Sequence, residues 1–378
     1  MKTHTSPPKT TLLRQRGLSL VELMISLTIG LILLAGLSLL FVESSRSHRE
    51  LSEMSKQVES GRYALQLLTD ELHLAGFYGR FADIPSVAIP VPATAPDPCA
   101  LGDTTALFNA LPIHIQGYAA ASFSARPVVS ALCAAFLPTA NLQPGSDVFA
   151  IRRADTSTLA ATATPTANDV YLQASSGAIE IQLGSNASAI GTTKKANGND
   201  ATAAPAVLNK DGSAAPIRKY RVHVYFVAPC SIPAGGGTIC TGPNDDGGKP
   251  IPTLKRLELT SIGGATAIST VSLVEGIEML KIDYGVDLTP APNSAGTIGD
   301  GAPESPFKRT PASLDEWSST VAANLYVLSR NPLSGGYTDS KAYAMGEAGD
   351  YTPGGNFRRH IYGASIRLSN PGMRREIP

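Results

Sequence analysis

The sequence predicts an α+β protein in which one long N-terminal helix precedes a mainly antiparallel β-sheet. No proline interrupts the chain from Leu18 to Gly79, so one helix can run through the whole stretch. Beyond it, short segments rich in β-branched and aromatic residues follow one another, and no helical pattern alternates with them. A sheet without crossover helices is expected to be antiparallel.

The first half of the predicted helix is apolar enough to span a membrane. From Leu23 to Val42 the chain carries no charge, and ~20 apolar residues at about 1.5 Å each match a hydrocarbon core of ~30 Å. Basic residues without acidic ones precede the span, whereas both signs follow it. The basic residues are Lys2, Lys9, Arg14 and Arg16. We therefore expect a cytoplasmic N-terminus and export of everything after residue 42.

A carboxylate lies at the start of the span, at Glu22, five positions after Gly17. In a spanning helix such a charge costs ~2.5–3.5 kcal/mol when central and less near the edge, so it usually has a partner. No Lys or Arg lies within one turn on its C-terminal side. Proteolysis after Gly17 would create a partner, because the α-ammonium of Leu18 would be charged near neutral pH, as α-amino groups ordinarily titrate at ~7.7–8.0. Glu22 would then lie one turn from that cation, or face the cation of a neighbouring subunit.

These residues resemble the class III signal of type IV prepilins, because the glycine, the glutamate, the basic leader and the apolar run fall in one register. In that family a prepilin peptidase cleaves after the glycine and methylates the new first residue, and the fifth-position glutamate guides assembly. The resemblance implies cleavage between Gly17 and Leu18, N-methylation of Leu18, and ammonium pairing by Glu22. Leu18 stands where the family usually has phenylalanine, which bears on the efficiency of methylation.

Two other classes of N-terminus share part of this pattern. One is an ordinary signal anchor that happens to contain Glu22. The other, a cleaved secretory signal, fits less well, because its apolar region would be shorter and a small-residue cleavage site would follow it. Phe41-Val42-Glu43-Ser44 offers no such site.

The second half of the predicted helix carries an apolar stripe. Two sets of residues recur every seven positions: Leu51, Val58, Leu65 and Leu72, and Met54, Gly61, Leu68 and Ala75. This period fits a coiled coil or a helix face laid on a sheet. In pilins, one long helix is half membrane anchor and half spine of an antiparallel-sheet head. The phrase Gly76-Phe77-Tyr78-Gly79 is expected to end the helix.

Six later segments have the composition of β-strands: Asp147–Arg152, Tyr220–Val227, Leu254–Ser261, Ile277–Val286, Val321–Leu328 and Ile361–Leu368. Between them, segments rich in Ala, Thr, Ser, Gly and Pro are expected to form surface excursions within one domain. These are Thr156–Asn168, Asn186–Pro216 and Thr289–Pro306. The predicted organisation is a leader over 1–17, a transmembrane helix over 18–42, an exported amphipathic part over 43–79 and a β-rich head over 80–378.

Composition and cysteines agree with an exported body. The chain has 378 residues, no formal net charge and 16% charged residues, so no strong field directs it to nucleic acid. Four cysteines in an oxidising compartment suggest two disulfides, although three pairings are possible. Nearness in sequence favours Cys99 with Cys133 and Cys230 with Cys240. Without a Cys-x-x-Cys spacing or a nearby histidine, neither a metal nor a cofactor is expected.

Catalytic motifs are absent from the sequence, and we do not expect an enzyme. It contains no Gly-x-Ser-x-Gly and no His-Glu-x-x-His, and its six histidines are dispersed. The stretch 242–249 departs from a phosphate-binding loop in its spacing. Asn244-Asp245-Asp246-Gly247 lacks the ligand pattern of a calcium loop and predicts a solvated turn. His223 is expected to be a hydrogen-bonded structural residue, and Trp317 a core residue.

Several phrases spread over most of the chain resemble PilW-type minor pilins. They occupy residues 61–64, 75–77, 144–148, 152–154, 251–256, 273–278 and 284–287. In that family further aspartates often follow the last phrase, but here Leu288 follows Asp287. A calcium-holding acidic loop is therefore not expected at this position.

The resemblance implies a minor pilin of a type IV pilus that helps to initiate assembly or forms part of the tip complex. It implies as partners the prepilin peptidase, other minor and major pilins through the N-terminal helix, the pilus assembly platform and the bacterial inner membrane, but no nucleic acid. The head would lie in the periplasm and, after assembly, in the pilus. The alternatives are a minor pseudopilin of a type II secretion system, and a pilus-displayed adhesin or binding module.

Overall fold

The computed structural model describes residues 17, 19–81, 89–100, 103–160, 163–176, 178–186, 207, 209, 211, 215–289, 299–332 and 337–376. The chain divides into two compact units, Met1–Ser52 and Glu53–Pro378. Helix α1 (Leu20–His73) contributes its first part to one unit and its second part to the other. Most of the leader and Leu18 lie outside the described residues, as do 187–206 and 290–298 of two predicted excursions.

Helix α1 begins with a capping contact and ends in a tight turn. The Ser19 N–H donates to Glu22 Oε2 at 3.1 Å, as expected for a glutamate at the third helical position that reaches back to the N-cap. At the other end Gly76 takes a φ of +70°, and its N–H donates to the carbonyl of Arg152 at 3.0 Å. The helix therefore ends at His73, before the predicted phrase, because the chain already turns there to meet the sheet.

The pairings among the described strands are all antiparallel, which agrees with the predicted mainly antiparallel sheet. The larger sheet has the order β1-β2-β5-β3-β4, with β6 paired to β5 and β7 paired to β6. Its strands are β1 (Ile115–Tyr118), β2 (Val148–Ala154), β3 (Val170–Ala174), β4 (Ile179–Leu183), β5 (Ile217–Ala228), β6 (Thr253–Ile262) and β7 (Ala265–Glu275). A second sheet has the order β12-β9-β8, and two short strands form a separate pair. These are β8 (Ile277–Val286), β9 (Thr320–Arg330), β12 (Arg359–Arg367), β10 (Tyr343–Ala344) and β11 (Asp350–Tyr351).

Short helices occupy the connections. The α-helices are α3 (Thr104–Asn109), α4 (Ala131–Ala134), α5 (Leu314–Ser318) and α6 (Ser369–Glu376). The 3-10 helices are η1 (Thr139–Asn141), η2 (Gly184–Asn186), η3 (Asp245–Gly247) and η4 (Gly346–Ala348). The six predicted strands correspond to β2, β5, β6, β8, β9 and β12, whereas the other strands were not predicted.

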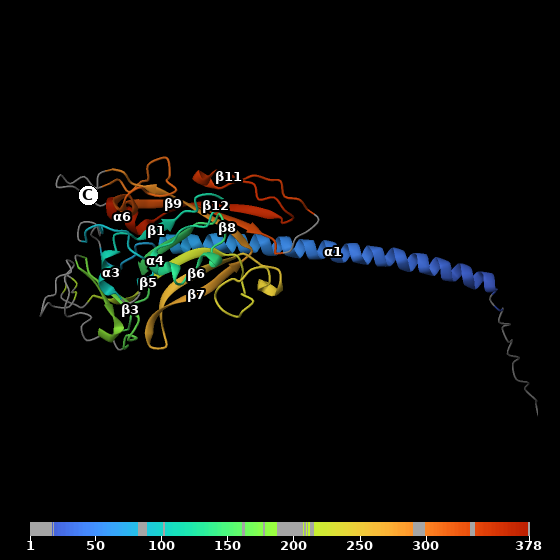
Figure 1. Ribbon diagram of the computed structural model, residues 1–378, viewed down its shortest axis with the longest axis horizontal. Helices are drawn as coiled ribbons and strands as arrows, with labels where there is room; N and C mark the ends of the chain where they lie inside the picture. The colour runs from blue at the N-terminus through green and yellow to red at the C-terminus, as the bar shows by residue number, and fades with distance from the viewer. Residues whose placement is uncertain are drawn as a thin grey trace, which may run out of the picture. The chain divides into compact units, whose positions relative to one another are not determined.

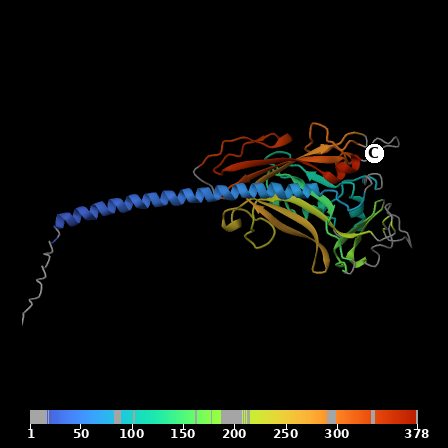
Figure 2. The same cartoon turned by 180° about the vertical axis from the view of Figure 1, so that it is seen from behind.

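The second part of α1 is the spine of the head. Ala64, Leu68 and Leu72 are fully buried and share one core cluster with side chains of both larger sheets. Figure 1 shows the three-stranded sheet on one side of this segment and the β6–β7 hairpin on the other, and Figure 2 shows the helix lying over the strands. The prediction of a helix face laid on a sheet is thus confirmed from Gly61 onward, whereas Met54 and Val58 remain 43% and 41% exposed.

Candidate functional site

The first unit presents an apolar helix on which none of the described residues packs. An 18-residue window of α1 has a mean hydropathy of 2.5, and none of it is buried. Its large apolar side chains between Leu20 and Val42 are 50% to 75% exposed. Among the described residues, α1 is the one helix long and apolar enough to cross a membrane. Apolar exposure of this extent marks a membrane or a partner surface.

Hydroxyl groups in this stretch are satisfied by the helix itself. Ser26, Thr28 and Ser38 each donate to a carbonyl three or four residues earlier, at 2.8–3.0 Å. Because the bilayer interior offers no water, a hydroxyl bonded in this way can enter lipid at little cost. The carboxylate of Glu22 is not fully satisfied by the helix in this way, since among the described residues the Ser19 N–H alone donates to it, at Oε2. It therefore retains acceptor capacity for a cation.

The predicted cleavage position lies directly before α1. Gly17 is exposed, and no described atom lies within 4 Å of the place where a Cβ would stand. Leu18 lies outside the described residues, so cleavage and methylation there stay predictions. The described geometry leaves the Gly17 backbone open to an enzyme.

Two contacts fix the middle of α1 on the three-stranded sheet. Buried Gln57 donates through Nε2 to the carbonyls of Ser329 at 3.2 Å and Arg358 at 3.0 Å. One turn further along, the ring of Tyr362 lies directly over Gly61, where a Cβ would come within 2.1 Å of Tyr362 Cε2. A glycine at this position is therefore required for the helix and β12 to approach so closely.

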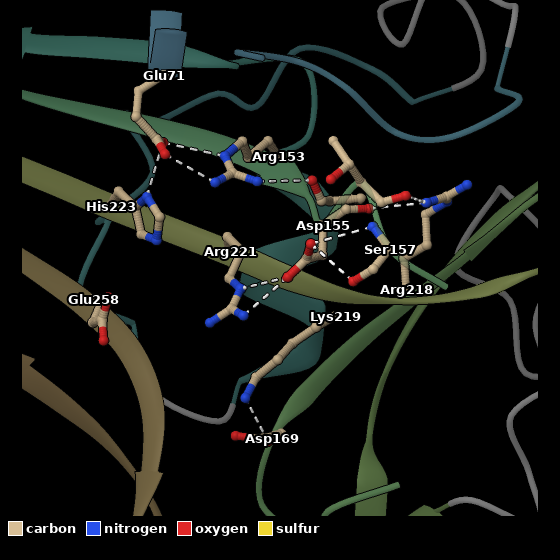
Figure 3. Close-up of polar contacts among 12 residues, drawn as sticks. Glu71, Arg153, Asp155, Ser157, Asp169, Arg218, Lys219, Arg221, His223 and Glu258 are labelled. Atoms are coloured by element: carbon tan, nitrogen blue, oxygen red, sulfur yellow. Dashed lines mark hydrogen bonds and ion pairs between the residues drawn. The ribbon is translucent and has the colours of Figure 1, made fainter. Parts of the chain in front are cut away.

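A polar network attaches the end of α1 to the larger sheet (Figure 3). Glu71 accepts two hydrogen bonds from Arg153, at 3.2 and 3.0 Å, and one from His223 Nδ1 at 3.0 Å. Neighbouring ion pairs join Arg221 to Asp155 at 2.9 Å, and Lys219 to Asp169 at 2.6 Å. Charged groups from α1, β2 and β5 thus meet in one cluster.

The state of charge of this network follows from its contacts. Burial opposes ionisation of Glu71, but the hydrogen bonds from His223 and Arg153 outweigh it and lower its pKa to about 2. Burial lowers the pKa of His223, although Glu71 partly compensates. A neutral His223 that donates from Nδ1 to ionised Glu71 is the arrangement consistent with both directions. The prediction of a hydrogen-bonded structural histidine is confirmed.

Both disulfides occur in the pairing that nearness in sequence favours. Cys99 is bonded to Cys133 and Cys230 to Cys240, with Cα–Cα distances of 5.0 and 5.8 Å. Because the sulfurs are bonded to each other, they offer no thiolates to a metal. Buried Asn141 binds the loop closed by the second disulfide: its Oδ1 accepts from the Cys240 N–H at 2.6 Å, and its Nδ2 donates to the carbonyl of Thr238 at 2.9 Å.

A turn is present at Asn244-Asp245-Asp246-Gly247, as predicted, and Asn244 and Gly247 are exposed. The prediction is wrong for the two carboxylates, which bind the protein's own backbone. Asp245 is 1% exposed, and both carboxylates accept hydrogen bonds from backbone N–H groups of the disulfide loop and its flanks. The donors are Ser231, Ile232, Ala234, Thr241, Gly242 and Ile251. The loop needs these acceptors because its irregular backbone cannot pair with itself. The oxygens of Asp245 and Asp246 that could bind calcium already accept these hydrogen bonds, and the Gly242 N–H that could bind a phosphate already donates to Asp245.

The remaining predicted positions are structural. Asp287 is 1% exposed and accepts from Arg375 Nε at 2.7 Å, so its carboxylate is bound to an arginine. Trp317 is a core residue, as predicted, with its ring centroid 4.6 Å from that of Tyr284. The contacts of Glu71 with Arg153 were not predicted from the sequence, because no local pattern joins residues so far apart in the chain.

The exposed apolar helix, the sheet-packed spine and the Gly17–Glu22 register are features that this chain shares with type IV pilin-like proteins, and among the described helices α1 is suited to anchor it in a membrane. Residues 12–38 match the prokaryotic N-terminal methylation motif, which implies processing by a prepilin peptidase. Residues 241–370 match the family described as Type IV Pilus-assembly protein W. The resemblance to PilW-type proteins is therefore confirmed over these residues.

No curated protein matches the chain. Among solved structures, a type IV-like pilin from Thermus thermophilus is 17% identical, over 40% of this chain and 79% of that one, with a TM-score of 0.18. A similarity at that level carries no argument about this fold.

Proposed function

We propose that this chain is a minor pilin of a type IV pilus, held in the bacterial inner membrane with its head in the periplasm until it is assembled. The observation that carries the proposal is the register of Gly17 and Glu22 with a helix that is bare at one end and sheet-packed at the other. A subunit built in this way can leave the bilayer only for another apolar environment. A bundle of similar helices provides one.

In this proposal the peptidase cleaves after Gly17 and methylates Leu18, and Glu22 then pairs with an α-ammonium. A buried carboxylate is costly when unpaired, so the pairing sets the axial register of the subunit as well as its affinity. The chain then helps to initiate the pilus or forms part of its tip. Assembly contacts with other minor and major pilins and with the assembly platform belong to the same proposal.

Glu22 also caps α1, so a test must separate the cap from the charge. Glu22→Gln retains a side-chain acceptor for the Ser19 N–H but removes the negative charge, whereas Glu22→Ala removes both. We expect both variants to be exported and cleaved, and both to fail to enter pili, as measured by immunoblots of sheared fibres. Incorporation of the Gln variant at the wild-type level would show that capping, and not charge pairing, is what assembly requires.

Processing is tested by the intact mass of the membrane-extracted protein with and without the peptidase. We expect a chain that begins at methylated Leu18 only when the peptidase is present. A chain that begins at Met1 in both strains would overturn the proposal. Deletion of the gene then identifies the machine: lost fibres and twitching support the minor pilin, whereas lost protein secretion with intact fibres would support a pseudopilin, and lost attachment alone an adhesin.

A further inference from the structure

Strand β7 is an edge strand without the usual protection. Among the described strands it pairs with β6 alone, and over its 11 residues it contains no proline and one charge, Glu275 at its end. Natural edge strands are usually short, or carry lysines, prolines or inward charges that prevent pairing with other chains. The other described edges of the two larger sheets follow this rule: β1 and β4 have 4 and 5 residues, β12 carries an arginine at each end, and β8 carries Glu278, Lys281 and Asp283.

A groove lies beside the end of this strand. It has a volume of about 1030 Å³, and its walls are one face of α1 from Met54 to Gln66 and residues Leu273–Glu275 of β7. Its apolar α1 side chains are open to solvent: Met54, Val58 and Tyr63 are 43%, 41% and 56% exposed. The β6–β7 register shifts at Leu273, so a bulge places this side chain in the groove wall and leaves Ala265–Ser272 regular.

We propose that β7 and the α1–β7 groove together form a docking site for an extended segment of another pilin-type subunit. The segment adds a strand at the free edge of β7 and lays alternate side chains against Met54, Val58 and Tyr63. This inference rests on the proposed function, because that function supplies the neighbouring subunits.

The free edge specifies a strand and not a helix. The N–H and C=O groups of β7 that point away from β6 have no backbone partner among the described residues. A helix could not provide one, since its own N–H and C=O groups are used internally. An added strand would satisfy them at a spacing of about 4.8 Å and present every second side chain to one face. Glu59 and Glu275 outnumber Arg62 among the charged residues of the groove wall, which favours a Lys or Arg beside the apolar positions of the segment.

The test places a photo-reactive residue in the full-length protein in its own membrane, as Tyr63→p-benzoylphenylalanine and separately as Ser272→p-benzoylphenylalanine. We expect adducts from both positions to map by mass spectrometry to the same short, β-prone segment of one protein that carries an N-terminal methylation motif. Adducts that map to different chains, to lipid, or to the N-terminal helix of a neighbour would overturn the proposal.

Two further measurements make the result specific. The chain with the probe at position 272 is also made with Val58→Asp, and the chain with the probe at position 63 with Ser272→Lys. Each second change should lower the adduct yield about tenfold, which corresponds to a loss of about 1.4 kcal/mol in binding free energy. Ile262→Lys, at the opposite end of the β6–β7 hairpin and 54% exposed in the wild type, should not lower it. Hydrogen exchange at residues 265–275 should slow in the complex, because a strand protects these amides and a helix does not.

Failure of this inference is distinguishable from failure of the proposed function. The intact mass of each probe-bearing chain reports whether it was cut after Gly17. A correctly processed chain without a shared adduct segment would overturn the docking site alone. An unprocessed chain would overturn the assignment as a pilin.

Discussion

The contact between Gly61 and Tyr362 depends on the absence of a side chain at position 61. Gly61→Ala should push the Tyr362 ring off the helix and destabilise the head by about 1 kcal/mol, since lost ring packing exceeds the gain in helix propensity of about 1 kcal/mol. In a Tyr362→Ala background the same change should stabilise the head, because only the propensity gain remains. Chemical denaturation of the four proteins measures both steps, and an effect of the same sign in both backgrounds would contradict the packing explanation.

His114 should make the head sensitive to acid. Burial, with a contribution from Arg374, lowers its pKa from 6.5 to about 3, and its Nε2 lies 2.7 Å from the carbonyl of Thr320. Between these values the unfolded chain binds a proton that the folded chain does not. Stability is therefore greatest above pH 6.5 and falls as the pH is lowered toward 3, by at most about 1.4 kcal/mol per pH unit.

Denaturation of the detergent-solubilised chain between about pH 4 and pH 7 tests this slope. His114→Asn should reduce the difference in bound protons between the unfolded and folded chains by about one, and so flatten the slope. His223, and Glu71 toward pH 4, still contribute to the slope in the same direction. The same substitution at exposed His360 controls for the loss of an imidazole. Equal slopes for the wild type and the His114 variant would contradict the assignment.

At the scale of elements, the predictable parts were those with a strong local pattern. The course of α1 follows from the absence of proline and from its apolar period, and β5 and β8 follow from their β-branched and aromatic composition. Strand β7 gives a weaker signal, because it holds no aromatic residue and Ala and Ser are interspersed among its β-branched residues. Pairing with β6 decides its conformation. Strands β3 and β4 have 5 residues each, too few for a period to stand out.

In the candidate site, too, the contiguous features could be predicted from the sequence and the contacts between distant residues could not. The Gly17–Glu22 signal is short and contiguous, so the sequence alone can place it. The groove beside β7 joins α1 to residues more than 200 positions away, and the Glu71–Arg153–His223 network joins three separate elements. Buried Asp245 was misread because a run of polar residues has the same composition whether its carboxylates bind water or the backbone of a neighbouring loop.

At the scale of the whole molecule, the testable question is on which side of the membrane the head lies. The leader carries Lys2, Lys9, Arg14 and Arg16 without an acidic residue, and basic residues hold a short N-terminal segment on the cytoplasmic side. Protease added to spheroplasts should therefore remove the head, whereas intact cells should protect it.

Two further results should accompany this topology. All four cysteines should resist alkylation until a reductant is added, because both disulfides need an oxidising compartment to persist. Replacing the four basic leader residues by Gln should reduce the protease-sensitive fraction, while Glu22→Gln should leave it unchanged, since orientation follows Lys and Arg and depends little on acidic residues. A head that is protected in spheroplasts and alkylated without reductant would place it in the cytoplasm, where neither the docking edge of β7 nor the spine of α1 could meet an exported partner.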